Sequence, residues 1–562
     1  MNSLSYTVRI SVSNVPNRSD IVILKYRPVC AGRELYHHQS YNRHYVSLEM
    51  LRAITLIIIF VAVKGDGCMR LSFGENGSVC VCNSTYCDTI EVPQLQQDQF
   101  LWYTSTKDGK MMESSINNFS KNKDKNMSKV LTLDSNKKHQ QIFGFGGAMT
   151  DAAALNIRTL SNETQRQLLE SYFGSTGIGY TFSRIPIAGT DFSTRPYTYD
   201  DVPNDFTLSN FSLVGEDDYK IEYLHRIKNI MSDPETLRIF TTSWSAPAWM
   251  KNTNNIKWGA LNPEYYQLYA DYIKKFFDAY KERGINIWGM TPGNEPIDGL
   301  VPFFPFNSMM WLPREGADWV VNHLAPTLSK AGYKDLIYMA MDDQRMLLPW
   351  YVETMFTNQK AKEVFSGTAI HWYADKQFSP DRLTRTHNKY PNKFMLITEA
   401  CTGTFPTNPF EPKVSLGSWS RGELYMLDII ENLSHYVSGW VDWNLALNKT
   451  GGPNWVENYV DSPIIVIPEE DQFYKQPMFY AIAHFSKFVP RNSYVIFSTL
   501  EERFKEENIK SIAFLTPEQK IVIVIVNKGK NPIPLTIKDT VRGKTISVTL
   551  PGKSFHTISY SA

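Results

Sequence analysis

Two glutamates in the 562-residue chain stand where side chains could act together as an acid and a nucleophile. Glu295 lies in the triplet Asn294-Glu295-Pro296, so an amide donor precedes its carboxyl group, and Glu399 follows an apolar run at residues 394 to 397. A protonated carboxyl group facing an ionised one is the arrangement that hydrolyses a glycosidic bond. Either glutamate alone could be a solvated side chain at the end of a strand. The two together predict a glycosidase, with Glu295 as the proton donor, its pKa raised, and Glu399 as the preorganised nucleophile.

Short apolar runs, separated by segments long enough for helices, must position these glutamates. There are eight of them, at residues 144–148, 180–187, 238–244, 286–295, 336–343, 368–373, 394–400 and 439–445. Eight strands alternating with helices over about 300 residues predict a (β/α)8 barrel, and a doubly wound open sheet is the alternative.

The active site of such a barrel lies where the strands end, so the polar and aromatic residues at these ends are the candidates for function. They are Asp151, Arg184, Asp191, Trp244, Asn294, Glu295, Asp342, Asp343, His371, Trp372, Tyr373, Glu399, Trp443 and Asn444. Trp372 and Phe145 are as well suited to the core as to ligand contact.

Two of the helices between the strands have clear boundary signals. Asn262 is a candidate N-cap, Pro263 suits the first helical position, an i/i+3/i+4 apolar stripe follows, and Gly284 ends the pattern. A second helix is predicted over residues 163 to 173, ended by Gly174.

Both ends of the barrel region are flanked by strand-like sequence. Residues 92 to 141 alternate short apolar runs with polar turns, and five β-branched segments separated by Gly, Pro, Asn and Asp follow residue 508. Neither end alone has enough strands for a stable domain, so the two ends are expected to build one β-sandwich together.

The composition excludes some classes of partner. Lys plus Arg number 58 and Asp plus Glu 57, leaving a net charge of +1, so long-range electrostatics favour neither nucleic acid nor an anionic surface. Aromatic residues reach 13%, and their faces are what proteins stack against sugar rings. The chain lacks a complete dinucleotide fingerprint or phosphate loop, and no cofactor or metal is expected.

One segment resembles a targeting signal. Residues 53 to 63 form an apolar run of eleven residues behind Arg52, too short for a spanning helix, which needs about 20 residues. We therefore expect translation to begin at Met50, residues 1–49 to be a non-native or alternative-start extension, and residues 50–67 to be a signal peptide. A signal anchor with a short cytoplasmic tail is the alternative.

The cysteines and glycosylation sequons agree with a secretory route. Cys68, Cys80, Cys82 and Cys87 fall just after the apolar run and suggest two disulfides, with a zinc site as the alternative. Cys30 lies upstream and Cys401 far downstream. Sequons begin at Asn76, Asn83, Asn118, Asn126, Asn162, Asn210, Asn432 and Asn448.

From Cys68 nearly to its C-terminus, the sequence resembles glycoside hydrolase family 30 and, within it, the lysosomal glucosylceramidases. The resemblance is carried by long motifs, among them CVCNSTYCD, GFGGAMTDAAALNI, YTYDDVPNDF, TEAC, GWVDWNLALN, GGPNWV, DSPIIV and FYKQPMFY. It implies a retaining β-glucosidase that hydrolyses glucosylceramide to glucose and ceramide, with Glu295 as acid/base and Glu399 as nucleophile. It further implies substrate contacts by Asp191, Trp244, Asn294, Trp443, Phe192, Phe304, Phe306, Tyr373, Asn458 and Tyr459.

The resemblance also implies a domain plan. A TIM barrel over residues 140–444 with 478–492 carries the site. An immunoglobulin-like β-sandwich combines residues 93–139 with 493–562, and a three-stranded β cluster with two disulfides combines residues 68–92 with 445–477. Cys401 resembles a free thiol of the family.

Two residues depart from the family pattern. Gly293 stands where the vertebrate enzymes have a glutamate, so a carboxylate next to the acid is missing, which should lower the pKa of Glu295. Phe304 replaces a tyrosine.

The resemblance implies a lysosomal or secreted enzyme on the lumenal membrane surface, with a glycolipid substrate, a saposin-type activator, anionic lipid and a sorting receptor as partners. A secreted family 30 glycanase and a catalytically silent glycolipid-binding homologue are the alternatives.

Overall fold

The computed structural model describes residues 9–11, 21–25, 46–47, 67–120, 129–403, 411–502 and 508–561. The chain divides into two units at residues 66 and 67. In the first unit, β1 (Arg9–Ser11), β2 (Ile21–Lys25) and β3 (Val46–Ser47) form a small antiparallel sheet. The apolar run at 53 to 63, the start at Met50, Cys30 and Asn126 lie outside the described residues, so the predictions on them stay predictions. No described helix is long and apolar enough to span a membrane.

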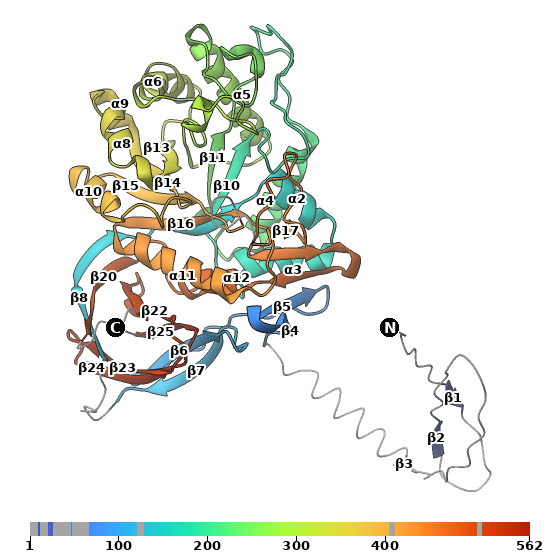
Figure 1. Ribbon diagram of the computed structural model, residues 1–562, viewed down its shortest axis with the longest axis vertical. Helices are drawn as coiled ribbons and strands as arrows, with labels where there is room; N and C mark the ends of the chain where they lie inside the picture. Colours follow the sequence, from blue (N-terminus) through green and yellow to red (C-terminus); the bar gives the residue numbers. More distant parts are fainter. Residues whose placement is uncertain are drawn as a thin grey trace. The chain divides into compact units, whose positions relative to one another are not determined.

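Eight parallel strands close into a barrel in the second unit, in sequence order (Figure 1). They are β9 (Gly144–Ala148), β10 (Phe182–Ile187), β11 (Arg238–Ser243), β12 (Gly289–Met290), β13 (Ile337–Gln344), β14 (Phe365–His371), β15 (Phe394–Glu399) and β16 (Val437–Asn444). The barrel prediction is confirmed. The open-sheet alternative is wrong because β16 pairs with β9, in a register that sets Gly439 opposite Gly144.

The seam between β16 and β9 depends on glycine. A Cβ atom on Gly439 would lie 2.4 Å from the carbonyl oxygen of Gly144, which is closer than backbone and side chain can approach. Gly144 itself has φ +133°, in the region that favours glycine. Larger residues at this seam would hold the first and last strands apart.

Helices cover the outside of the barrel (Figure 1). They are α2 (Asp151–Arg158), α3 (Asn162–Phe173), α4 (Gly215–Ile230), α5 (Tyr266–Glu282), α6 (Pro313–Trp319), α7 (Ala325–Lys330), α8 (Trp350–Met355), α9 (Gln359–Val364), α10 (Asp381–Lys389), α11 (Trp419–Ser434) and α12 (Pro477–Ser486). The helix α5 buries the predicted stripe, which includes Tyr269, Tyr272, Phe276 and Tyr280.

Both predicted helix boundaries need correction at their first turn. Before α5, residues Pro263–Tyr265 form a separate 3-10 turn, and the side chain of Asn262 accepts no capping hydrogen bond. Helix α3 begins at Asn162, one residue before the predicted start, and Ser161 caps it, because its hydroxyl accepts the backbone N–H of Thr164.

A smaller sheet lies beside the barrel and holds both disulfides. Its strands, in spatial order, are β17 (Leu447–Asn448), β18 (Ile464–Ile467), β19 (Gln472–Lys475), β5 (Ser78–Asn83) and β4 (Arg70–Ser72). The described sheet therefore has five strands, and the expected number of three is wrong.

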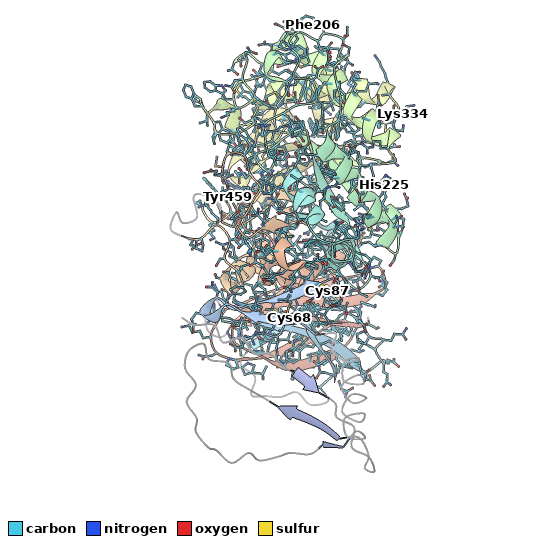
Figure 2. The ribbon with its side chains drawn as sticks, turned by 90° about the vertical axis from the view of Figure 1, so that its right-hand side faces the viewer. Cys68, Cys87, Phe206, His225, Lys334 and Tyr459 are labelled. Atoms are coloured by element: carbon cyan, nitrogen blue, oxygen red, sulfur yellow. A yellow bond between two sulfur atoms is a disulfide. The ribbon has the colours of Figure 1, made fainter. Side chains whose placement is uncertain are left out.

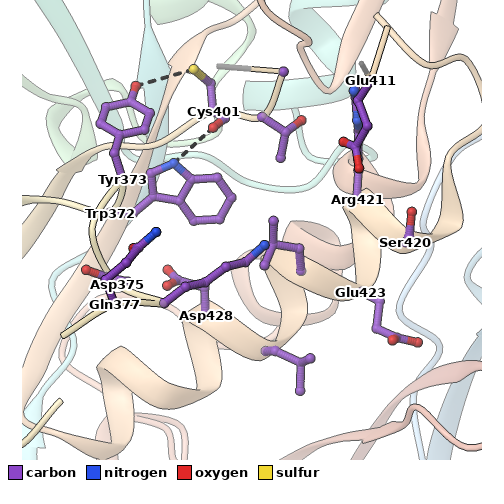
Figure 3. A pocket seen from close by; sticks show the side chains of 15 residues that line it. Trp372, Tyr373, Asp375, Gln377, Cys401, Glu411, Ser420, Arg421, Glu423 and Asp428 are labelled. Atoms are coloured by element: carbon purple, nitrogen blue, oxygen red, sulfur yellow. Dashed lines mark hydrogen bonds between the residues drawn. The ribbon is translucent and has the colours of Figure 1, made fainter. Parts of the chain in front are cut away.

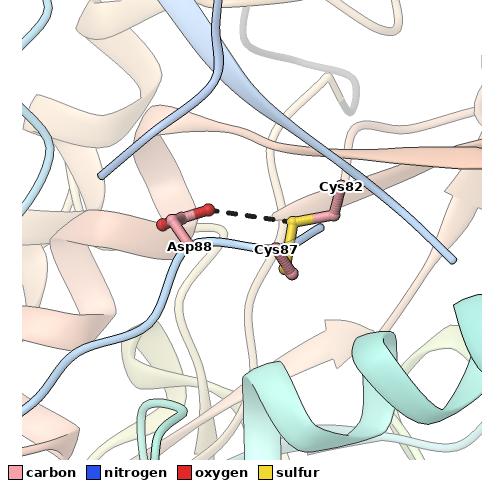
Figure 4. Close-up of side chains that lie close together, drawn as sticks. All are labelled: Cys82, Cys87 and Asp88. Carbon is pink, nitrogen blue, oxygen red and sulfur yellow. Dashed lines mark hydrogen bonds between the residues drawn. A yellow bond between two sulfur atoms is a disulfide. The ribbon is translucent and has the colours of Figure 1, made fainter. Parts of the chain in front are cut away.

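The four cysteines near this sheet pair as Cys68 with Cys80 and Cys82 with Cys87. Figure 2 labels Cys68 and Cys87, and Figure 4 draws the disulfide between Cys82 and Cys87. The zinc alternative is wrong because all four sulfur atoms are used in disulfide bonds. Asp88 follows the second disulfide directly in the chain, and its carboxylate forms a buried ion pair with Lys475, 2.7 Å away.

Strands from both ends of the chain form one nine-stranded sheet in the order β24-β23-β8-β20-β21-β22-β25-β6-β7. Their bounds are β6 (Gln99–Thr106), β7 (Glu113–Asn118), β8 (Lys129–Gln141), β20 (Tyr494–Glu502), β21 (Ile509–Leu515), β22 (Lys520–Asn527), β23 (Ile533–Asp539), β24 (Lys544–Leu550) and β25 (Ser554–Ser561). Of the N-terminal strands, β8 lies between β23 and β20, and β6 pairs with β25. A largely aliphatic core fills the interior of this domain. This confirms that both ends build the β domain.

Asn432 is fully buried in α11, where its Nδ2 donates to Asp375 Oδ2 at 3.1 Å. It is therefore not a surface sequon in the folded chain.

Candidate active site

A cavity of about 530 Å³ lies at the carboxyl ends of the barrel strands and contains both predicted glutamates. Eleven of the twelve predicted catalytic and substrate-binding residues line it: Asp191, Phe192, Trp244, Asn294, Glu295, Phe304, Phe306, Tyr373, Glu399, Trp443 and Asn458. The twelfth, Tyr459, which is labelled in Figure 2, is not among the lining residues. Its ring lies against Gly452, where an added Cβ atom would be 2.9 Å from Cε1.

Seven of the strand-end candidates do not line the cavity. Four of them, Arg184, Asp342, His371 and Trp372, are described below, and the other three are Asp151, Asp343 and Asn444. Asp151 forms a buried ion pair with Lys220, 2.9 Å away, in a network behind the site. Asp343 accepts backbone N–H groups, including that of Gln344 at 2.6 Å, and Asn444 accepts the hydroxyl of Thr150. These residues support the loops at the barrel mouth.

Glu399 is held by donors on both of its oxygens. It is the last residue of β15, and the run before it is buried, so its side chain leaves the barrel in a fixed direction. The guanidinium of Arg184 donates to Oε2, and the hydroxyl of Tyr373 donates to Oε1 at 2.8 Å. These hydrogen bonds stabilise a negative charge on the predicted nucleophile and fix its orientation.

Arg184 is the fully buried centre that joins Glu399 to its neighbours. From β10, its Nη2 donates to Asn294 Oδ1 at 2.9 Å and to Asp342 Oδ2 at 3.0 Å. The guanidinium also lies 5.0 Å from the ring centroid of Trp244 and 5.2 Å from that of Trp443. Arg184 therefore positions the predicted nucleophile, the amide and both indoles at once.

Asp342 is the buried carboxylate that pairs with Arg184 in this network. It lies in β13 with a left-handed backbone, φ +68°, at an irregularity in the pairing of β13 with β14. Its carboxylate accepts the hydroxyls of Thr398 at 2.6 Å and Thr291 at 2.8 Å in addition to Arg184. Burial raises the pKa of Asp342, but the charges of Arg184 and His371 outweigh burial and hold it well below the usual range.

His371, the last residue of β14, bridges Asp342 and Glu295. Its Nε2 lies 3.1 Å from Asp342 Oδ1, and its Nδ1 lies 2.8 Å from Glu295 Oε1. Burial lowers the pKa of His371, but the surrounding carboxylates of Glu399, Asp342 and Glu295 raise it well above its ordinary value. With a carboxylate on each ring nitrogen, this histidine acts as a cationic donor and has no free nitrogen for a metal ion.

Glu295 lies beyond the two-residue strand β12, in the loop that follows it. Its backbone is left-handed, φ +39°, and its N–H donates to the carbonyl oxygen of Asp342 at 2.9 Å. Gln344 Nε2 donates to Oε1 at 2.6 Å, alongside His371. Burial raises the pKa of Glu295, but the hydrogen bond and charge of His371, with Asp298 and Arg184, hold it below its usual value.

The electrostatics of Glu295 correct two expectations from sequence. The pKa of the predicted proton donor is lowered, not raised, because a cation shares its hydrogen bonds. The carboxyl group that Gly293 fails to supply is present after all, since the carboxyl of Asp298 hydrogen-bonds that of Glu295. Neither Asp298 nor Gln344 was singled out from sequence. Asp298 stands three residues after Glu295, and Gln344 stands one residue beyond the predicted end of its strand. These two positions were the only features of the sequence that could have indicated a role at the site.

The separation of the two glutamates determines what chemistry the site can perform. One oxygen of Glu295, one oxygen of Glu399 and a ring nitrogen of His371 all lie within 4.8 Å of one another. Carboxyl groups about 5 to 5.5 Å apart suit direct attack on a sugar, whereas pairs about 6.5 to 9.5 Å apart leave room for a water between them. The spacing fits a double displacement.

Neutral and aromatic groups form the opposite wall. Asp191 accepts Nδ2 of Asn454 and of Asn458, each at 3.1 Å, and burial raises its pKa to about 7. The rings of Trp244 and Trp443 stack with centroids 5.2 Å apart. Such a wall suits an uncharged, amphipathic ring such as a hexose.

A second cavity, of about 290 Å³, adjoins the first and is drawn in Figure 3. Trp372 lines this cavity and not the first, and its Nε1 donates to the carbonyl oxygen of Cys401 at 2.9 Å. Because the Tyr373 hydroxyl donates its only hydrogen to Glu399, the Cys401 thiol is the donor in the 3.3 Å contact between them. Burial raises the pKa of this thiol well above its ordinary value, which makes it a poor nucleophile.

Comparison with known proteins agrees with this geometry. Residues 142–489 match the glycosyl hydrolase family 30 TIM-barrel domain, and residues 492–558 match the family 30 beta sandwich domain. The lysosomal acid glucosylceramidase of Mus musculus is 42% identical over 505 residues, covering 88% of this chain and 96% of the mouse protein.

Solved structures share the same architecture. SrfJ from Salmonella typhimurium superimposes with a TM-score of 0.75 at 25% identity, over 83% of this chain and 100% of SrfJ. An endo-β1,6-glucanase gives a TM-score of 0.72 at 24% identity, over 83% of this chain and 100% of its own, which supports the fold alone.

Proposed function

Because the chain belongs to glycoside hydrolase family 30, we propose that this glycosidase hydrolyses glucosylceramide to glucose and ceramide with retention of configuration. The observation that carries the mechanism is the 4.8 Å limit on the separation of Glu295 and Glu399 oxygens, which favours direct attack by a carboxylate on the sugar. The substrate is supported by the likeness to the mouse glucosylceramidase over nearly the whole of both chains.

In the first displacement, the Glu399 carboxylate attacks the anomeric carbon while Glu295 protonates the glycosidic oxygen. The bond to ceramide breaks as the bond to Glu399 forms, and ceramide leaves as an alcohol. Arg184 and Tyr373 keep the attacking carboxylate in line, because each donates to one of its oxygens. A fixed nucleophile does not need to reorient in the transition state, which is where preorganisation lowers the barrier.

In the second displacement, Glu295 removes a proton from a water molecule that attacks the same carbon. The ester to Glu399 breaks, glucose is released with its original configuration, and Glu399 is again a carboxylate. His371 and Gln344 donate to Glu295 Oε1 and stabilise it in its ionised state between the two steps.

The rest of the cavity suits recognition of a neutral hexose. Arg184 occupies Oδ1 of Asn294, so the amide Nδ2 of Asn294 is the group left to donate to a sugar hydroxyl. Asp191 can accept from a second hydroxyl, and Trp244 and Trp443 offer apolar faces. No step of this mechanism requires a metal or a cofactor.

We further propose that the enzyme works in the lysosome or along the secretory pathway, at a lumenal membrane surface that carries its glycolipid substrate. The two disulfides support an oxidising compartment. A saposin-type activator, anionic lipid and a sorting receptor are the partners proposed from the resemblance.

The test measures release of ceramide from glucosylceramide in vesicles with anionic lipid, and of the aglycone from an aryl β-glucoside. Glu399→Gln and Glu295→Gln should each abolish ceramide release, whereas the control Glu163→Gln, an exposed glutamate on α3, should not change it. Turnover within about threefold of wild type in either catalytic variant would refute the role of that residue. Faster hydrolysis of soluble β-glucans than of glucosylceramide would replace the proposed substrate with a polysaccharide.

A further inference from the structure

Asp298 and Glu295 hold their carboxyl groups together inside the cavity. A hydrogen bond joins the two side chains, and both residues line the same cavity. An ionised carboxylate has no hydrogen to donate, so two carboxyl groups in a hydrogen bond must have at least one proton between them. Two carboxyl groups held this close do not both ionise readily, so the pair favours a state in which one of them keeps a proton.

The backbone holds the two residues next to each other. The Asp298 N–H donates to the carbonyl oxygen of Glu295 at 2.9 Å, which closes a four-residue turn. A 3-10 helix then begins at Asp298 and continues to Leu300, and Val301 N–H donates to the carbonyl of Asp298 at 3.0 Å. These backbone hydrogen bonds set the Cα atom of Asp298 at a defined place beside Glu295.

The groups around Asp298 favour its protonated form. Glu295 from the loop after β12 and Asp343 from β13 place like charges near it, and His371 from β14 is the cation whose charge opposes them. Burial, followed by the charges of Glu295 and Asp343, raises the pKa of Asp298 to about 10. Arg184 from β10 and His371 act in the opposite sense on Glu295, whose pKa is lowered.

The inference rests on the proposed function, in which Glu295 is the proton donor. The pKa shifts, however, favour the proton on Asp298 and the charge on Glu295. A proton donor that is ionised at rest cannot protonate a leaving group. We infer that Asp298 is a positioning residue that acts through Glu295, by storing the proton that Glu295 delivers to the leaving oxygen.

The proton follows a closed path. When substrate binds, the proton moves from Asp298 to Glu295 and from Glu295 to the glycosidic oxygen as the glycosidic bond breaks. Both carboxyl groups are then ionised. In the second step Glu295 takes a proton from the attacking water and returns it to Asp298. The pair thus gains and loses one proton in each turnover, and its titration belongs to both residues.

Asp298→Asn tests this inference because asparagine keeps the shape and a donor but cannot supply a proton. In the pH profile of kcat/KM for phenyl β-glucoside, we expect the alkaline limb to move to lower pH by about one unit or more. The reason is that Glu295 then titrates alone beside His371 and Arg184. With 2,4-dinitrophenyl β-glucoside, whose aglycone leaves without protonation, the limb should stay where it is in the wild type.

Asp343→Asn is the matched control. It removes a neighbouring buried carboxyl group that accepts hydrogen bonds from the backbone N–H groups of Ile297 and Gln344. Its alkaline limb should move less than that of Asp298→Asn. An equal shift in the two variants, an equal shift with both substrates, or no shift with phenyl β-glucoside would each overturn the inference.

A second measurement does not depend on activity. The infrared difference spectrum between wild type and Asp298→Asn near pH 8 should contain the stretch of a protonated carboxyl group, which only the wild type carries. If wild type hydrolyses no β-glucoside, the proposed function fails, while this spectrum still decides whether the proton is shared. Absence of the band would overturn the stored proton even in an active enzyme.

Discussion

Replacing Arg184 with methionine should destabilise the fold and disable the site together. Methionine fills much of the same space but leaves the carboxylates of Asp342 and Glu399 without their shared cation, and the side chain of Asp342 is fully buried. Removing one partner of a buried ion pair costs about 3–5 kcal/mol in the free energy of unfolding. Turnover should fall by about a hundredfold or more, because Glu399 loses its alignment.

The pH dependence separates this explanation from a simple loss of packing. Arg184 and His371 hold the pKa of Asp342 below its value of about 4 in the unfolded chain. Its stabilising contribution is therefore complete above about pH 4 and is lost as the pH falls through the native value. The stability difference between wild type and Arg184→Met should be largest near neutral pH and should shrink on acidification.

Urea unfolding followed by tryptophan fluorescence, near pH 7 and near pH 3.5, measures both terms. The double variant Arg184→Met with Asp342→Asn removes the buried anion together with its partner and should recover more than half of the loss near pH 7. A loss below about 1 kcal/mol near pH 7, or an equal loss at both pH values, would refute the reasoning.

Three further predictions follow from single contacts. Burial raises the pKa of Asp191 to about 7, so the folded wild type must bury a charged carboxylate above that pH. Asp191→Asn should therefore weaken turnover but increase the free energy of unfolding near pH 8, and not near pH 4. A gain of stability near pH 4 would contradict this. Tyr373→Phe removes a donor to the carboxylate of Glu399 worth about 1.5–3 kcal/mol and should lower kcat by about 10- to 100-fold, and an unchanged kcat would exclude this contact from the mechanism. Replacing Cys68 and Cys80 with serine should lower the free energy of unfolding by about 2–3 kcal/mol, measured by urea unfolding, because the cross-link no longer restricts the unfolded chain; no change would show that the loop is not restrained.

The barrel could be predicted because local pattern decides it. Each apolar run corresponds to one barrel strand, since a parallel strand buried on both faces reads as a short continuous apolar segment. The prediction was least accurate for the strand before the acid/base, because β12 ends at Met290 whereas the predicted run continues to Glu295. The irregular backbone there includes the left-handed Glu295, and it aims that side chain into the cavity.

The network that supports the glutamates could be predicted only in part. Arg184, Asp342 and His371 were expected at the site from their strand-end positions. Which of them would touch depends on side-chain reach across the barrel and on the irregular pairing of β13 with β14, and local sequence specifies neither. Asp298 was missed because its contact with Glu295 requires a specific turn, which the intervening proline and isoleucine do not specify. Tyr459 was assigned from resemblance alone, and its ring lies against Gly452.

The central claim is that Glu399 forms a covalent bond to the sugar. Incubation with 2-deoxy-2-fluoro-β-D-glucosyl fluoride slows the second displacement and accumulates the intermediate. We predict that the intact protein gains the mass of one fluoroglucosyl group and that peptide mapping places it on Glu399, with no adduct in Glu399→Gln. A label on any other residue, or continued turnover of an aryl β-glucoside by a fully labelled protein, would contradict the account.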